Sequence, residues 1–424
     1  MNVLIVGSGG REHALALKVK ESHKLENLFI APGNAGTSFI GKNVNLNPSD
    51  HKEIIDFCKT QGINLVVIGP EKPLAEGLAD NLAENNIPVF GPRKNAAQIE
   101  SNKAFAKNLM KKYGIPTAEY KVFKKQDYIN AVTYAKSISY PVVVKASGLA
   151  AGKGVSICYT ALEAENAIKE CFEYNVFGDA GNEIVVEEFL EGQEFSVFAV
   201  ASGTDYIVLP PAQDHKRIGE GDTGKNTGGM GAYAPTPFIT DEILQRVKTE
   251  IIEKTLNALK SEGREYSGCL YCGLILTEEG PKVIEFNCRF GDPETQVVLP
   301  LLEGDFLDLL YSVASGNINK AAVKYNGGAA LCVVTASKGY PGKYEKGFEI
   351  KGLEKINDPD IQIIHAGTKA VNGKIFTNGG RVLNIVAIDG EGNLRYCKEK
   401  AYASLLKVKY EGIYYRKDIG SKAL

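Results

Sequence analysis

The 424-residue sequence contains no tryptophan, only 3 methionines and no excess of charge of either sign. Its 49 basic and 51 acidic residues give a net charge of -2, so bulk charge favours neither nucleic acid nor any other polyanion as a partner. The sequence also lacks a run of about eighteen apolar residues, and its first residues read as a strand rather than as an export signal. It therefore predicts no membrane partner, and any phosphate site must be local.

Cysteine is also sparse, with 8 residues that lack the spacing of a disulfide framework. This usage is typical of a reducing compartment and predicts a cytoplasmic protein. Cys269 and Cys272 have the spacing of a zinc or redox motif, but no second pair exists and their apolar neighbours indicate a buried strand. We interpret both as structural thiols. The histidines show no pattern with a serine or cysteine partner, which argues against a hydrolase triad.

The length predicts several domains, because one ordinary core cannot organise so long a chain. In residues 1–101, short apolar runs alternate with helical patterns, which predicts a parallel sheet with helices on both faces. The expected strands are residues 3–6, 28–31, 65–68 and 89–90. The helices between them are expected to begin near Arg11, Asp50, Pro73 and Arg93.

Residues 102–326 predict a second domain, with residues 121–190 as a small α+β lid subdomain. Residues 214–233 are polar and glycine-rich and show no convincing helix or strand, so we expect a functional loop there. Residues 327–424 contain short apolar runs between glycine-rich turns and predict a mainly β domain. The predicted class is thus a multidomain α/β and α+β protein.

Glycines 7, 9 and 10 follow the first predicted strand, as in turns that bring backbone close to a phosphate at a helix N-terminus. The full dinucleotide fingerprint is absent, because Glu12 stands in place of the third glycine and no acidic residue follows the second strand. An NAD-dependent oxidoreductase is therefore disfavoured. A phosphate-bearing small molecule and a plain tight turn both remain open.

Residues 145–154 resemble a Walker A loop only superficially. Ser147 stands where that loop needs a glycine, and Gly154 stands where it needs the hydroxyl that holds Mg²⁺. The segment instead predicts a glycine-rich flap that closes over a triphosphate, with Lys145 on the preceding strand and Lys153 in the turn. An exposed basic hairpin is the alternative, and the second lysine makes it the weaker one.

Two strand ends carry further ligand signals. Residues 187–190 end a strand where backbone groups could read an adenine edge, although acidic strand ends are also common solvated features. Glu285 and Asn287 lie two residues apart in a predicted strand, so their side chains share one face. Two hard oxygen ligands suit Mg²⁺, which takes its other ligands from water and substrate phosphates. Arg289 follows, where a guanidinium could clamp a carboxylate or a developing phosphate charge.

The polar loop opens with one acid and one base, Asp214 and Lys216. Such a pair can hold the ammonium and carboxylate of a small zwitterion. A solvated charge cluster is the open alternative.

Taken together, these residues resemble the ATP-grasp superfamily and, within it, the phosphoribosylamine–glycine ligase family. The similarity runs the length of the chain and is most specific in residues 7–13, 32–37, 145–155, 213–231 and 289–294. It implies a ligase of de novo purine biosynthesis that uses ATP and Mg²⁺ or Mn²⁺. The implied reaction joins glycine to 5-phosphoribosylamine through glycyl phosphate, giving glycinamide ribonucleotide, ADP and phosphate. Another ATP-grasp ligase or a carboxylase is the runner-up, and a nucleotide-binding regulator without turnover is a third reading.

The resemblance also implies a role for each matched position, and it leaves open a transient hand-over of phosphoribosylamine from the enzyme that makes it. The implied catalytic residues are Lys145, Asp214 and Arg289, and the metal ligands are Glu285 and Asn287. The implied nucleotide-binding residues are Lys103, Lys145, Ser147, Gly148, Lys153, Gly154, Glu187, Glu188, Phe189, Leu190 and Glu194. The implied substrate-binding residues are Gly9, Gly10, Glu71, Asp214, Lys216, Arg289 and Asp292.

Overall fold

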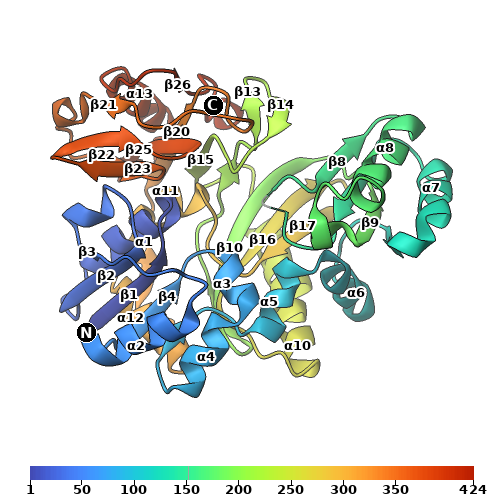
Figure 1. Cartoon of the computed structure of the whole chain (residues 1–424), viewed down its shortest axis with the longest axis horizontal. Coiled ribbons are helices and arrows are strands. Elements are labelled where there is room, and N and C mark those ends of the chain that lie inside the picture. Colours follow the sequence, from blue (N-terminus) through green and yellow to red (C-terminus); the bar gives the residue numbers. More distant parts are fainter. Residues whose placement is uncertain (151) are drawn as a thin grey trace.

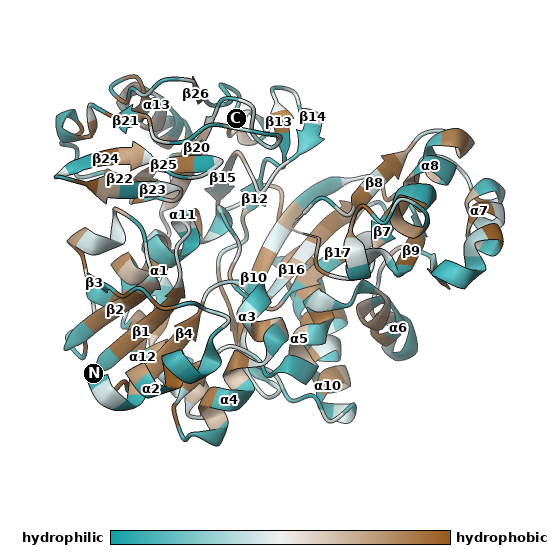
Figure 2. Cartoon of the chain, in the orientation of Figure 1, coloured by the Kyte–Doolittle hydropathy of each residue, from teal (hydrophilic) through white to brown (hydrophobic). Residues whose placement is uncertain are grey.

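The structure, a computed structural model, describes residues 1–150 and 152–424. Figure 1 shows the N-terminal sheet next to the C-terminal sheet, with the lid subdomain standing apart at the far end of the central sheet. Figure 2 shows that apolar residues concentrate along the strands of these sheets. None of the helices in the described part of the chain is long and apolar enough to cross a membrane.

The N-terminal sheet is parallel, with strand order β3-β2-β1-β4-β5. Its strands are β1 (Asn2–Gly7), β2 (Asn27–Pro32), β3 (Lys42–Asn43), β4 (Leu65–Ile68) and β5 (Val89–Phe90). Leu4 and Val6 belong to one core cluster, whereas Val3 and Ile5 belong to another, because alternate side chains of a strand face opposite ways. Both faces are therefore covered, as predicted. The four predicted strands are present, and only the short β3 was not foreseen.

The helices of this region are α1 (Gly10–Lys20), α2 (His51–Gln61), α3 (Glu71–Glu76), α4 (Leu78–Glu84), α5 (Lys94–Ser101) and α6 (Lys103–Tyr113). Of these, α1, α2, α3 and α5 start close to the predicted positions. The side chain of Asn102 caps α6 by accepting the Phe105 amide at 2.8 Å. Gly114 ends that helix with a φ of +62°, a conformation that favours glycine.

The lid subdomain is a four-stranded antiparallel sheet, ordered β6-β9-β7-β8, that packs against two helices. Its elements are β6 (Tyr120–Lys124), α7 (Tyr128–Ser137), β7 (Val142–Ala146), β8 (Val155–Cys158), α8 (Ala161–Phe172) and β9 (Glu183–Glu188). The turn between β7 and β8 carries the glycine-rich flap, and β9 ends at the predicted adenine-reading segment.

The central sheet has the order β11-β10-β16-β17 and is antiparallel. Its strands are β10 (Gln193–Ser202), β11 (Asp205–Val208), β16 (Ser267–Thr277) and β17 (Gly280–Asn287). Cys269 and Cys272 are free and buried in β16. The neighbouring helical segments are α9 (Asp241–Arg246), η4 (Val247–Ile252), α10 (Glu253–Ser261), α11 (Glu294–Val298) and α12 (Phe306–Ala314). A π-helical stretch, η4, joins α9 to α10.

The prediction that residues 214–233 lack strands is wrong. Four short strands lie there: β12 (Gln213–Asp214), β13 (Arg217–Gly219), β14 (Thr223–Asn226) and β15 (Gly231–Ala234). β15 pairs with β20 (Ala329–Ser337), about a hundred residues further along the chain. Such strands obtain their hydrogen bonds from distant partners, so their own short polar sequences carry no periodic signal.

The C-terminal sheet has the order β12-β15-β20-β25-β22, and α13 (Leu394–Leu405) packs against it. The remaining strands are β18 (Leu302–Gly304), β19 (Val323–Tyr325), β21 (Glu349–Ile350), β22 (Ile361–His365), β23 (Thr368–Val371), β24 (Lys374–Thr377), β25 (Arg381–Asp389) and β26 (Ile413–Tyr414). The 3-10 helices are η1 (Thr37–Phe39), η2 (Lys125–Asp127), η3 (Gly178–Gly181), η5 (Leu299–Leu301), η6 (Leu353–Lys355) and η7 (Ser421–Ala423).

Candidate active site

Two lysines and one glutamate form a buried ionic group, which we call the lysine cluster: Lys107, Lys145 and Glu187. The Nζ of Lys145 contacts Oε1 of Glu187, and the Nζ of Lys107 lies 2.5 Å from Oε2. All three side chains are at most 5% exposed. Burial raises the pKa of Glu187, but the two ammonium groups outweigh it and the net shift is downward, so the carboxylate stays ionised. Burial lowers the pKa of Lys107 and Glu187 opposes that shift, so the cluster places two amines on one ionised carboxylate.

The lysine cluster is tied to strand β17, which carries the predicted metal ligands. Lys145 donates to the carbonyl of Ile284 at 3.1 Å. Lys107 donates to Oγ1 of Thr117 at 2.7 Å, and that hydroxyl donates to the carbonyl of Val283 at 2.7 Å. The base of the flap and the strand that bears Glu285 thus meet in one place.

The base of the flap is also fixed to the start of α6. Lys103 donates through Nζ to the carbonyl of Gly148 at 3.1 Å, and its backbone amide donates to the carbonyl of Ser147 at 2.8 Å. Burial lowers the pKa of the Lys103 amine, and Glu285 opposes that shift. Lys153 is exposed in the turn, next to Gly154, whose carbonyl accepts the amide of Ala146. Residue 151 of the flap lies outside the described residues.

At the end of β9, the predicted adenosine contacts fall into two groups. Glu187 points into the lysine cluster, so its carboxylate is not directed to solvent. Glu188 accepts the backbone amide of Glu119 at 3.0 Å, and Phe189 and Leu190 are half-buried. The side chains that remain accessible for a base at this strand end are therefore those of residues 188–190.

The predicted zwitterion pair lies where the central and C-terminal sheets meet. The Nζ of Lys216 is 3.9 Å from Oδ1 of Asp214 and 2.7 Å from Oε2 of Glu194. Burial raises the pKa of Asp214 to about 7; Lys216 opposes this shift, whereas Glu294 and Glu194 add to it. Oε1 of Glu294 accepts the Tyr271 hydroxyl at 2.8 Å. The site therefore combines a fixed ammonium with a carboxyl group that titrates near neutral pH.

Arg289 is held in a second ionic group, which we call the arginine cluster: Arg289, Glu71 and Glu100. The guanidinium lies 3.3 Å from Oε2 of Glu71 and 3.0 Å from Oε1 of Glu100, and it donates to Oδ1 of Asn287 at 3.3 Å. Burial alone would raise the pKa of Glu71, but Arg289 and Arg11 lower it to about 2. Burial raises the pKa of Glu100. This cluster places one guanidinium between two carboxyl groups.

Glu285 and Asn287 fit a cation that keeps most of its ligands from elsewhere. In residues 1–150 and 152–424, the carboxylate of Glu285 has neither a hydrogen bond nor an ion pair, and no group of three or more His, Cys, Asp or Glu side chains could cage a metal. Mg²⁺ usually binds through one or two protein oxygens together with water and substrate phosphates. The donor set thus suits Mg²⁺ beside a phosphate and does not suit a structural zinc.

The glycine turn after β1 is closed by its own helix. The amide of Gly9 donates to Oε2 of Glu12 at 2.6 Å, and Nε of Arg11 donates to Oε1 at 2.6 Å. Asp292 accepts from Gln296 at 2.8 Å and lies 3.1 Å from the guanidinium of Arg381 in β25. A Cβ atom added at Gly10 would lie 2.7 Å from Gln296 and Asn384, so glycine allows close packing here. Gly9, Gly10 and Asp292 therefore lie at the junction with the C-terminal sheet.

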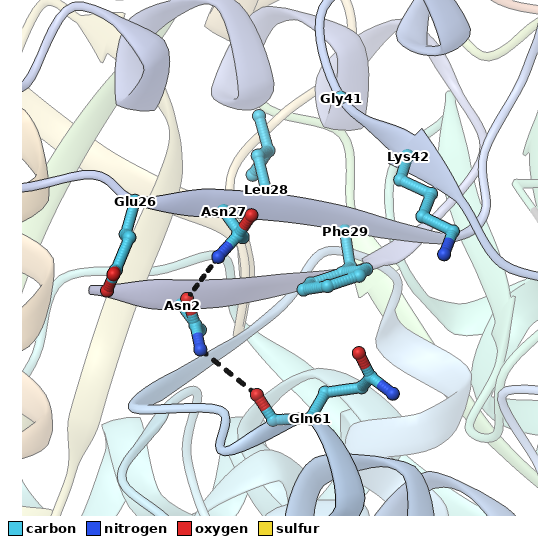
Figure 3. A pocket seen from close by; sticks show the side chains of 8 residues that line it. All are labelled: Asn2, Glu26, Asn27, Leu28, Phe29, Gly41, Lys42 and Gln61. Carbon is cyan, nitrogen blue, oxygen red and sulfur yellow. Dashed lines mark hydrogen bonds between the residues drawn. The ribbon is translucent and has the colours of Figure 1, made fainter.

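A hollow of about 440 Å³ lies away from these residues, where strands β1 and β2 of the N-terminal sheet begin (Figure 3). Asn2 and Asn27, which begin β1 and β2, are hydrogen-bonded at 2.8 Å across it, and Asn2 also donates to the carbonyl of Gln61. The candidate site lies at the carboxyl ends of these parallel strands, so this hollow contains none of the predicted site residues.

Sequence reasoning missed Lys107 and Glu100. Lys107 could have been found, because it lies four residues after Lys103 and therefore on the same face of α6. Glu100 gave no local signal. Its partners Arg289 and Cys288, whose amide donates to Oε2 at 2.7 Å, are almost two hundred residues away.

Three family profiles match the chain. They are described as the N domain (residues 1–100), the ATP-grasp (A) domain (residues 101–295) and the C domain (residues 330–422) of phosphoribosylglycinamide synthetase. The phosphoribosylamine–glycine ligase of Rhodopirellula baltica is 46% identical over 431 residues, which cover 100% of this chain and 98% of that protein. The human trifunctional purine biosynthetic protein adenosine-3 is 47% identical over 426 residues, and this chain spans 42% of its length.

Solved structures of similar proteins also superpose on almost the whole chain. The phosphoribosylamine–glycine ligase of Thermotoga maritima superposes with a TM-score of 0.86 at 35% identity, covering 99% of this chain and 100% of that one. The biotin carboxylase domain of 2-oxoglutarate carboxylase from Hydrogenobacter thermophilus, solved with MgADP and bicarbonate, superposes with a TM-score of 0.73 at 19% identity, over 98% of this chain and 91% of that one. At that identity only the fold is shared.

Proposed function

From the premise that the chain belongs to the phosphoribosylglycinamide synthetase family, we propose that it joins glycine to 5-phosphoribosylamine in an ATP-dependent reaction of purine biosynthesis. The products are glycinamide ribonucleotide, ADP and phosphate. The observation that carries the proposal is the contact between the base of the flap and strand β17, where Lys145 donates to the carbonyl of Ile284 beside Glu285.

The first step activates glycine. Its carboxylate attacks the γ-phosphorus of ATP, ADP leaves, and glycyl phosphate forms. Lys145 and Lys153 neutralise phosphate oxygens, and Lys103 holds the flap where it can cover them. Mg²⁺ or Mn²⁺ bound by Glu285 and Asn287 would offset the charge that builds up on the phosphates.

Glycine is held by Asp214 and Lys216, at the start of the polar loop. Ionised Asp214 accepts hydrogen bonds from the ammonium group, and Lys216 attracts the carboxylate until it is phosphorylated. Arg289 faces the acyl phosphate from the arginine cluster, where its Nη1 also donates to the carbonyl of Phe290 at 3.3 Å. Residues 188–190 and Glu194 contact adenosine, at the strand end beside the flap.

In the second step the amine of phosphoribosylamine attacks the carbonyl carbon of glycyl phosphate, and phosphate leaves. Gly9, Gly10, Glu71 and Asp292 line the side from which this acceptor enters. Acyl phosphates hydrolyse readily, so residues 145–154 close over the intermediate to exclude water.

Substrate dependence tests the proposal. ADP release should require glycine and phosphoribosylamine together. Release driven by bicarbonate would instead favour a carboxylase, the alternative function, since a biotin carboxylase domain shares this fold. ATP binding without phosphate release in the presence of both substrates would favour a regulator.

We propose further that the chain divides into residues 1–101, 102–326 and 327–424; the family profiles, which match residues 1–100, 101–295 and 330–422, support three parts in this order. We also propose a cytoplasmic location, since all 8 cysteines are free. Because phosphoribosylamine is unstable, a transient hand-over from the enzyme that makes it would protect the acceptor.

A further inference from the structure

Lys107 is a buried cation whose hydrogen bonds are directed entirely into the protein. Its Nζ lies 2.5 Å from Oε2 of Glu187, donates to Oγ1 of Thr117 at 2.7 Å and lies 5.5 Å from the centre of the Tyr120 ring. Its side chain is 4% exposed. Lys145 is equally buried, so the difference between the two lysines is one of position: these partners of Lys107 all lie outside the flap.

Lys145 shares the same carboxylate but lies at the base of the flap. To bind a triphosphate, its ammonium group must turn from Glu187 toward phosphate oxygens. If Lys145 were the only partner of Glu187, this movement would leave a carboxylate, itself almost fully buried, without a counter-charge. An unpaired buried charge is strongly destabilising, so the movement would oppose nucleotide binding.

We propose that Lys107 is a positioning residue for ATP: it neutralises Glu187, so that Lys145 can leave that carboxylate and bind the triphosphate. Lys107 stays in place while Lys145 moves. The inference rests on the proposed function, because it requires Lys145 to bind the phosphates of ATP. It assigns the two lysines different roles, although both contact one side chain.

Replacement of Lys107 by methionine tests the inference, because the apolar stem is kept and only the charge is lost. The full-length variant should bind a non-hydrolysable ATP analogue about 10- to 100-fold more weakly in calorimetric titrations. Its affinity for adenosine, which has no phosphate for Lys145, should change less than about twofold. Lys111→Met is the matched control, since Lys111 also lies near the Tyr120 ring but is exposed.

A second background separates charge from packing. With Glu187→Gln already present, no carboxylate remains in the lysine cluster, so adding Lys107→Met should weaken binding of the ATP analogue by less than about threefold. Equal losses in the two backgrounds, or equal losses for adenosine and the ATP analogue, would overturn the inference.

Lys107→Arg keeps the charge and guards against a variant that merely misfolds. It should bind the ATP analogue within about threefold of the native protein; a loss as large as that of Lys107→Met would count against the inference. Failure of the proposed function looks different. ADP release that does not need both glycine and phosphoribosylamine would reject the ligase while leaving the coupling of Lys107 to Glu187 measurable.

Discussion

The lysine cluster and the arginine cluster contact the same strand, β17, with opposite stoichiometry. Lys107 and Lys145 share one carboxylate, whereas Arg289 is shared by two. Burial lowers the pKa of Lys107 and raises the pKa of Glu100, so what remains in excess is an amine on the side of the flap and a carboxyl group on the side of the N-terminal sheet. In a site that contains little water, charges are weakly screened, so the composition of each cluster strongly affects the electrostatic energy of a bound group. The two clusters therefore differ in their balance of acidic and basic groups, a difference that the presence of ion pairs alone does not reveal.

The largest effect on turnover is expected for Glu285, which lies in β17 between the two clusters. Glu285→Ala should lower turnover about 100-fold or more, because it removes a metal ligand and not core volume. The melting temperature should stay close to native. Steady-state ADP release checks this, with Glu278→Ala in the exposed turn before β17 as the matched control. A near-native rate would refute the metal role of Glu285.

A smaller effect is expected on the arginine side. Arg289→Lys keeps the charge but loses the planar fork that reaches Glu71, Glu100 and Asn287 together, so one carboxylate is left without its partner. We expect kcat/KM for phosphoribosylamine to fall about tenfold while affinity for the ATP analogue stays unchanged. Loss of ATP affinity instead would contradict the separation of the two sides.

The third prediction concerns pH. Burial raises the pKa of Asp214 to about 7, so its charged form, which holds the ammonium of glycine, disappears below neutrality. Between pH 6 and 8, kcat/KM for glycine should rise about tenfold, as the ionised fraction does. Asp214→Asn should be less active and should lack this rise. A rise of the same size in that variant would assign it to another group.

With rising pH, the free energy of unfolding should change in the opposite direction to kcat/KM for glycine. The folded protein retains a proton on Asp214 that the unfolded chain, with the ordinary value of 3.8, has already released. The free energy of unfolding should therefore fall as pH increases from about 4 to about 7 and level off above. Urea denaturation of the native protein and of Asp214→Asn across that range isolates this contribution.

The smallest effect is expected at the surface. Lys112 and Glu262 lie 2.6 Å apart, as close as Lys107 and Glu187, but Lys112 is exposed. Water screens such pairs, so Lys112→Ala should leave both the melting temperature and affinity for the ATP analogue unchanged. A clear loss in either would show that short distance alone, rather than burial, sets the strength of these clusters.

Much of the fold could be predicted because its signals are local. The apolar run at Leu65–Ile68, the cap at Asn102 and the glycine at residue 114 each act within a few residues. The strands at Gln213–Asp214 and Gly231–Ala234 could not be predicted, since their hydrogen bonds come from each other and from Ala329–Ser337.

In the candidate site, too, local sequence patterns could be predicted and contacts between distant segments could not. Motif spacing selected Lys145, Glu285 and Asn287 as candidates for one ligand site, and the structure brings Lys145 to the strand that carries the other two. The spacing did not indicate that Glu187 would turn away from solvent, or that Glu100 would share Arg289. Those contacts join segments whose separation along the chain gives no clue to their distance in space.

The sequence by itself determined most of the elements of this protein and the chemical types of its candidate ligand groups, because hydrophobic period, caps and motif spacing act over short stretches of chain. Only the tertiary structure decided how many charges each buried cluster contains, since helix α6, the lid sheet and strand β17 must pack together before Lys107 and Lys145 can share Glu187. Burial then fixes the pairing, because a charge removed from water needs a partner wherever the fold can supply one.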